Sequence, residues 1–224
     1  MEKLRNIIVT SDASGAKKAA QAGMLVIIVD VIDMSTTLES ALDAGACYVL
    51  GASPDYTNAP VSVNPYAIGL YAGNLAQEKG SKIIIVSEPR VGTDEERARR
   101  CQNVIKGIGE TKAIIEAIIP NIGAEVVKIT DFKDKIVIAV TDTGGVAFDA
   151  AFMENRQVIT ATVARTYRQK GVEPAITGVK RVFDTIKPSD TGIAVVAASQ
   201  NSLEDVLAAQ YIANLIMNYR SLSV

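Results

Sequence analysis

The chain has 224 residues, of which 48% are hydrophobic and 21% charged, as is ordinary for a globular α/β protein with a substantial core. Its formal net charge of −2 argues against non-specific binding to nucleic acid, which requires a basic face. No apolar run is long enough to cross a bilayer and the N-terminus lacks a signal-peptide pattern, so we expect a cytoplasmic protein that contacts no membrane.

Short apolar strands alternate with helical segments along the whole chain. Strands are expected at residues 6–9, 24–29, 47–50, 82–86, 125–129, 135–140, 157–160 and 192–198. Helices are expected before Gly23, at residues 38–44 and 65–79, after Thr93, up to residue 119, through residue 152, and at residues 163–170, 177–186 and 202–219. The alternation predicts an α/β fold with three α/β/α layers and a mainly parallel or mixed sheet, either as one domain of residues 1–224 or as two intertwined lobes of it.

The strand at residues 24–29 leads into a polar segment. Its unbroken aliphatic run fits a strand that is buried on both faces. Asp30 and Asp33 follow the strand, and three consecutive hydroxyl side chains occupy residues 35–37. A carboxylate this close to a buried strand is costly unless a metal, a cation or several backbone N–H groups balance its charge. We therefore treat Asp30 as a candidate functional residue.

The same segment carries helix-capping signals. Thr36 and Glu39 have the spacing of a capping box, in which each side chain bonds the backbone N–H of the other residue. These residues could therefore serve only to begin a helix. Thr93 and the pair Ser202 and Asp205 give similar signals at two later helices.

Two further apolar strands end in polar clusters. Residues 82–86 lead to Glu88 and Arg90, and residues 135–140 lead to a run of two threonines, an aspartate and two glycines at residues 141–145. Ligands of open α/β sheets bind at the carboxyl ends of strands, so parallel neighbouring strands would bring all three clusters to one edge. The plainer alternatives are a surface ion pair between Glu88 and Arg90, and a tight turn at residues 141–145 that needs glycine.

An edge of this composition suits a phosphorylated ligand. Helix N-termini and glycine-rich turns bind anions, and Arg90 could hold phosphate oxygens with two N–H groups. Carboxylates that hold Mg²⁺ would offset the phosphate charge. Histidine is absent, which excludes serine and cysteine triads and every histidine base. Cys47 and Cys101 have the spacing of neither a disulfide framework nor a zinc site.

Four segments of the chain resemble the 2-phosphosulfolactate phosphatase (ComB-like) family. Residues 29–37, V-D-V-I-D-M-S-T-T, resemble that family's V-D-V-x-R-A-[ST]-T-T, and residues 88–92 resemble its G-E-R-G turn with one extra residue. Residues 141–145, T-D-T-G-G, resemble its T-T-N-G-T turn, and residues 202–209, S-L-E-D-V-L-A-A, resemble the opening of its C-terminal helix. The segments lie in the family's order and cover most of the chain.

The resemblance implies a three-layer α/β fold and Mg²⁺-dependent hydrolysis of a small acidic 2-phospho compound on the route to coenzyme M. On this resemblance, Asp30 falls on the active-site aspartate, and Glu88 and Arg90 fall on a Glu-Arg pair. Asp33 stands where the family has arginine, which makes the site more acidic. Two other hypotheses therefore stay open: a non-catalytic protein that binds a ligand or metal on the same scaffold, and an assembly subunit in which these residues only cap helices.

These observations define the expected site. The catalytic candidates are Asp30, Glu88 and Arg90, and the candidate Mg²⁺ ligands are Asp30, Asp33 and Asp142; Asp30 would either hold the metal or attack phosphorus. Substrate contacts are expected from Ser35, Thr36, Thr37, Thr141, Thr143, Gly144 and Gly145. The expected partner is a small phosphorylated acidic molecule, with no nucleic acid, and the strongly apolar helices are compatible with a homodimer.

Overall fold

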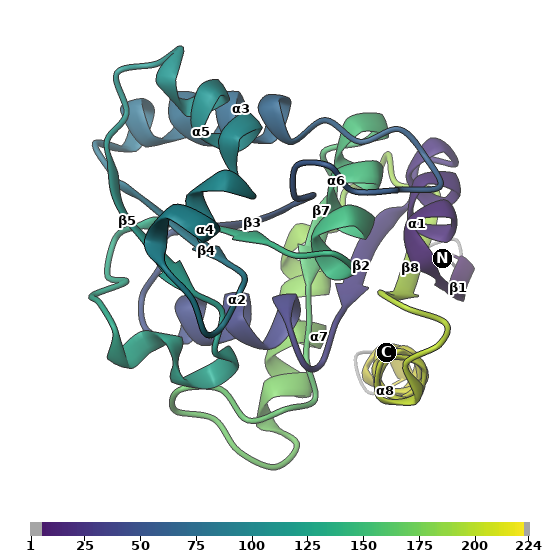
Figure 1. The fold of residues 1–224 in the computed structure, drawn as a ribbon. Helices are drawn as coiled ribbons and strands as arrows, with labels where there is room; N and C mark the ends of the chain where they lie inside the picture. The colour runs from purple at the N-terminus through teal and green to yellow at the C-terminus, as the bar shows by residue number, and fades with distance from the viewer. Residues whose placement is uncertain (1–5, 222–224) are drawn as a thin grey trace.

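The computed structural model describes residues 6–221 and confirms a three-layer α/β fold with parallel strands (Figure 1). The strands form two sheets of four rather than one sheet. The first sheet has the order β1 (Asn6–Ser11), β8 (Gly192–Ala197), β2 (Leu25–Val29), β7 (Val158–Thr160). The second has the order β3 (Tyr48–Ala52), β6 (Ile136–Val140), β4 (Ile83–Ser87), β5 (Ile115–Pro120). The chain thus leaves the first sheet after β2 and returns to it at β7.

Helices cover both faces of the two sheets. They are α1 (Asp12–Gln21), α2 (Met34–Asp43), α3 (Pro65–Lys79), α4 (Asp94–Arg99), α5 (Gln102–Gly109), the 3₁₀ helix η1 (Gly123–Lys128), α6 (Gly144–Glu154), α7 (Glu173–Thr185) and α8 (Leu203–Ser221). Both α2 and α6 contact strands of each sheet, so they lie between the sheets. In Figure 1 the second sheet, with α3 and α5, is on the left, and the first sheet, with α1 and α8, is on the right. None of the helices in the described part of the chain is long and apolar enough to span a membrane.

The strand β2 shows why an unbroken apolar run forms the centre of the first sheet. All five of its residues are fully buried. Leu25, Ile27 and Val29 face a core cluster that they share with α7 and α8, whereas Val26 and Ile28 face the larger cluster that extends to the second sheet. Because successive side chains of a strand point to opposite faces, a strand covered on both sides must be apolar at every position.

Three expected elements differ in the structure. Residues 125–129, expected as a strand, lie largely within the 3₁₀ helix η1. The helix expected to end at residue 119 is the strand β5, which ends at Pro120 on the edge of the second sheet, where proline is tolerated because no partner needs its missing N–H. Residues 163–170, expected as a helix, form an irregular segment with two bends. Bonds from Ala164 N to Thr162 Oγ1 (3.1 Å) and from Thr166 Oγ1 to Asp43 Oδ2 (2.8 Å) compete there with helical bonds.

The capping expectations were right at two helices and wrong at one. Thr93 forms a complete capping box with Glu96 at α4, and Ser202 Oγ accepts a hydrogen bond from Asp205 N at α8. The box expected from Thr36 and Glu39 does not form, because α2 begins earlier, at Met34. Glu39 is instead buried, and its carboxylate accepts hydrogen bonds from Arg181 at 2.5 and 2.9 Å and from Thr160 Oγ1 at 2.7 Å.

Candidate active site

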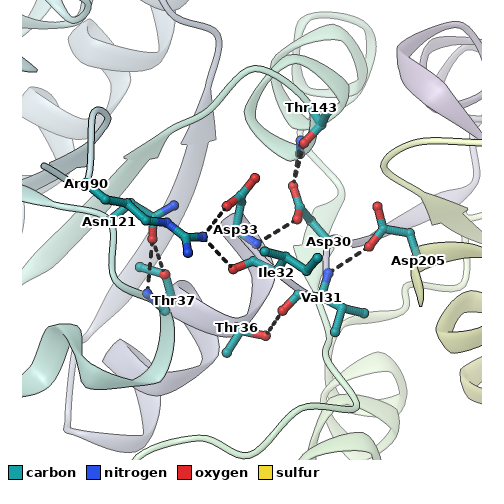
Figure 2. A network of polar contacts seen from close by, with 12 residues as sticks. Asp30, Val31, Ile32, Asp33, Thr36, Thr37, Arg90, Asn121, Thr143 and Asp205 are labelled. Carbon is teal, nitrogen blue, oxygen red and sulfur yellow. Dashed lines mark hydrogen bonds and ion pairs between the residues drawn. The ribbon is translucent and has the colours of Figure 1, made fainter. Parts of the chain in front are cut away.

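The three polar clusters meet, although their strands do not all belong to one sheet. The strand β2 belongs to the first sheet, whereas β4 and β6 belong to the second. Hydrogen bonds nevertheless join the segment after β2 to the segment after β6, and an ion pair joins it to the segment after β4 (Figure 2). The expectation of parallel neighbouring strands was therefore right for β4 and β6, which pair with each other, and wrong for β2. The clusters come together because α2 and α6, which begin at this edge, are packed between the two sheets.

Asp30 lies at the centre of the contacts between these clusters. Its Oδ1 accepts a hydrogen bond from Asp33 N at 3.0 Å, and its Oδ2 accepts from Thr143 Oγ1 at 2.9 Å and Gly144 N at 2.8 Å. Only 2% of the residue is exposed. Burial raises the pKa of Asp30, while these three hydrogen bonds act in the opposite direction. Asp30 is therefore a buried carboxylate balanced by the starts of two helices, α2 and α6.

The two glycines of the β6–α6 turn are required for close approach. A Cβ atom on Gly144 would overlap Asp30 Oδ2 and lie 2.8 Å from Met34 Cβ. A Cβ atom on Gly145 would overlap the carbonyl oxygen of Ala52 and lie 3.2 Å from Thr141 Oγ1. Neither glycine has a positive φ angle, so the turn needs their small size rather than their backbone freedom.

The hydroxyl groups expected to contact substrate are bonded within the protein. Ser35 Oγ accepts from Asp30 N at 3.0 Å and donates to the carbonyl oxygen of Ile28 at 2.9 Å. Thr36 Oγ1 donates to the carbonyl oxygen of Val31 at 2.5 Å, and Thr141 Oγ1 accepts from Gly145 N at 2.8 Å.

Thr37 Oγ1, the third hydroxyl at the start of α2, donates to Asn121 Oδ1 at 2.5 Å. The hydroxyl-bearing residues 35–37 and 141 are buried, so in this structure they hold the loops in place rather than face solvent.

Two arginines and three acidic residues form an outer layer around Asp30. Arg90 pairs with Asp33 at 2.7 Å, rather than with Glu88, and its Nη2 also donates to the carbonyl oxygen of Ile32 at 3.3 Å. Arg100 pairs with Asp142 at 2.6 Å.

Glu88 is half-buried in this layer, and its burial is the largest of the causes that raise its pKa. The charges of Asp33 and Asp142 raise the pKa of Glu88 further, whereas Arg100 and Arg90 lower it. The carboxylates of the second and third clusters therefore lie close enough to act on one another.

Sequence reasoning missed Arg100, Asn121 and Asp205. Arg100 follows α4, far from any strand end, and nothing in the sequence pointed to it. Asn121 directly follows β5, the same position relative to its strand as Asp30 has after β2, so the strand-end rule would have found it had β5 been recognised.

Asp205 is the third residue of the site that the sequence reasoning missed. Its Oδ1 accepts a hydrogen bond from Val31 N at 2.9 Å, and burial and the charge of Asp30 raise its pKa to about 6.

The expected trio of metal ligands does not form a ready metal cage. Among residues 6–221, no group of three or more histidine, cysteine or acidic side chains is arranged to hold a metal ion. Asp30 already accepts three hydrogen bonds. Mg²⁺ usually binds through one or two carboxylates, with water and substrate phosphate as its other ligands. Asp33 and Asp142 suit that mode, because both carboxylates are partly exposed. The negative charge of each also raises the pKa of Glu88, so the three acidic groups lie near one another.

Comparison with known proteins does not assign the chain to a family. No protein-family model matches the chain, and no curated protein matches it. The resemblance to the 2-phosphosulfolactate phosphatases is therefore an inference from four sequence segments alone.

Proposed function

We propose that the protein is a cytoplasmic, Mg²⁺-dependent hydrolase of a small acidic phosphoester, with its active site at the carboxyl ends of β2, β4 and β6. One observation carries the proposal. Polar residues that follow three buried strands of two different sheets, Arg90 among them, meet around Asp30, and Arg100 from the end of α4 joins them. A structural role alone would not require carboxylates to gather where the charges of Asp33 and Asp142 act unfavourably on Glu88.

The two arginines would bind the phosphate group of the substrate. The side chains of Arg90 and Arg100 are 46% and 33% exposed, so their guanidinium groups can reach a ligand without unfolding. A phosphate that takes two N–H groups from each arginine would replace the carboxylates of Asp33 and Asp142. Binding therefore exchanges two protein ion pairs for two ion pairs with the substrate.

The carboxylates released in this way would hold the Mg²⁺ ion. Asp30, Asp33, Glu88 and Asp142 outnumber the two arginines, so an anionic substrate needs a further positive charge at this edge. When bound, Mg²⁺ would supply that charge and polarise a phosphoryl oxygen. Asp33 and Asp142 would hold it.

Glu88 would take a proton from the attacking water, since burial and the charges of Asp33 and Asp142 raise its pKa. Asp30 would not attack phosphorus, because both of its oxygens are occupied and only 2% of it is exposed. Its role is to hold the first N–H groups of α2 and α6 in place. The backbone of the two turns would then not need to reorganise when a phosphate binds at this edge.

The test is Mg²⁺-dependent phosphate release from a panel of small phosphoesters, including 2-phospho acids. We expect Glu88→Gln and Arg90→Ala each to lower kcat/KM by at least about a hundredfold, a typical loss for a general base or a charge-stabilising group. Glu78→Gln, on the exposed surface of α3, is the matched control and should leave the rate unchanged. Equal rates for the wild type and both site variants on every hydrolysed substrate would contradict the proposal.

The second candidate is a non-catalytic protein that binds a phosphorylated ligand or a metal ion. The observation that favours it is the ion pair between Arg90 and Asp33. Asp33 stands where the family that the chain resembles has an arginine, so Arg90 already has a partner of opposite charge and the site has one positive charge fewer. This candidate predicts that Mg²⁺ or a phosphorylated ligand raises the Tm while no phosphate is released. Turnover by the wild type that Glu88→Gln abolishes would rule it out.

A further inference from the structure

Between Asp205 and Arg220, α8 has none of the charges that a solvent-exposed helix normally carries, although Glu204 in its first turn is charged and exposed. Residues 206–219 contain no lysine, arginine, aspartate or glutamate. One face of α8 packs on the first sheet through Ala208, Ala209, Ile212 and Ile216, among others. On the opposite face, Leu203, Leu207 and Tyr211 are 66%, 60% and 40% exposed. Their spacing of four residues places them in one stripe along the helix.

The neighbouring helix α7 shows that the position in the fold does not impose this composition. Both α7 and α8 cover the same face of the first sheet and contact each other. The exposed positions of α7 include Glu173, Lys180 and Asp184, as expected for an amphipathic helix that faces water. The apolar stripe of α8 is therefore a property of this helix, and contiguous exposed apolar surface of this kind marks an interaction site.

We propose that the outward face of α8, formed by Leu203, Leu207, Gln210, Tyr211, Asn214 and Met217, is the interface of a homodimer. A two-fold axis brings each surface against its own copy, so charges near the axis would meet like charges. A stripe without any charge avoids this repulsion. Gln210 and Asn214, which are hydrogen-bonded to each other at 3.2 Å, are amides that both donate and accept, so they can also pair with their own copies.

Other occupants fit this surface less well. A helix that lies on a membrane surface carries lysine or arginine beside its apolar face, and residues 203–219 contain neither. A strongly charged protein partner would find no charge to pair with on the stripe. A second copy of the chain meets only a weak overall repulsion, because each chain has a net charge of −2. One helix face is smaller than the about 800 Å² per partner of a standard interface, so we expect a reversible dimer.

The test is sedimentation velocity across about 1–200 μM protein, a range chosen to span the dissociation of such an interface. We expect the wild type to shift from 23.7 kDa monomer to dimer over this range. Leu207→Glu should remain monomeric, with a dissociation constant raised at least about tenfold, because it places two like charges opposite each other. Val172→Glu is the matched control, since Val172 is a 55% exposed apolar residue at the start of α7, outside the proposed interface, and its replacement should leave the dimer intact.

Mixing opposite charges separates loss of the interface from loss of folding. Leu207→Glu and Leu207→Lys should each be monomeric alone, and a mixture of the two should form a heterodimer. A wild type that stays monomeric at every concentration overturns the proposal. A dimer that Leu207→Glu leaves intact also overturns it, including one that only Val9→Lys, on the exposed edge strand β1, dissociates.

Discussion

The turn between β2 and α2 and the turn between β6 and α6 have the same plan. Each follows a fully buried strand of five residues and leads into a helix that lies between the two sheets. Asp30 takes the first position after β2, and Thr141 takes the first position after β6. Asp30 is buried and bonds to the starts of both helices, whereas the carboxylate of the other turn, Asp142, is exposed and paired with Arg100.

The difference shows how one carboxylate can replace two helix caps. Asp33 and Thr143 are the N-cap residues of α2 and α6, yet neither caps its own helix with its side chain. Asp33 donates its N–H to Asp30, and Thr143 donates its hydroxyl to Asp30. The unpaired N–H groups of two helix starts favour a negative charge between them, which offsets part of the cost of burying it. Asp30 therefore joins the two sheets as well as marking the candidate site.

The largest effect that would test this comparison is expected from Gly144→Ala. The added methyl group would overlap Asp30 Oδ2 and crowd Met34 Cβ, so we expect a loss of about 3 kcal/mol in the free energy of unfolding, measured by urea denaturation. Gly109→Ala, at the end of α5, is the control, because its added methyl group meets no atom within 4 Å. It should be neutral or stabilise by about 0.4–1 kcal/mol. Equal losses from both variants would show that the contact with Asp30 is not tight.

Asp30→Asn should give the next largest effect. In either orientation its amide group faces a backbone N–H, of Gly144 or of Asp33, so one buried donor loses its acceptor. We expect a loss of about 2 kcal/mol. Asp142→Asn, in the matching turn, should cost less than about 0.5 kcal/mol, because the Asp142 side chain is 56% exposed. If the two variants were equally stable, the two turns would not differ in the way described.

The last effect is expected from the pH dependence of Asp205, which binds the β2–α2 turn through Val31 N. Its pKa rises from 3.8 to about 6 on folding, so between these values the folded state holds the proton more strongly than the unfolded state. Stability from this group is therefore present below pH 3.8 and falls as the pH rises to about 6. Asp205→Asn should remove that fall, at most about 3 kcal/mol for a shift of this size, from unfolding curves compared across this range. An unchanged pH profile would contradict the shift.

The sequence predicted the buried strand before Asp30, and it predicted that this carboxylate needs a metal, a cation or several backbone N–H groups, because both expectations follow from local composition. It could not show that β2 lies in a different sheet from β4 and β6, because every one of these strands is equally apolar and the pairing depends on distant partners. It also assigned Asp205 to a capping box, when its carboxylate bonds Val31 in another part of the chain. Local spacing identified the correct helix start there and missed the tertiary contact.

The path of the chain through the two sheets has a consequence for its synthesis. All of the second sheet lies between β2 and β7, so it can form before the ribosome has added β7, β8 and α8. The strand β2 must wait, because both of its neighbours, β7 and β8, follow the second sheet in the chain. Asp205 is added later still. A nascent or truncated chain that ends before α8 would therefore leave the β2–α2 turn without one of its anchors, and only a chain that extends into α8 can complete the candidate site.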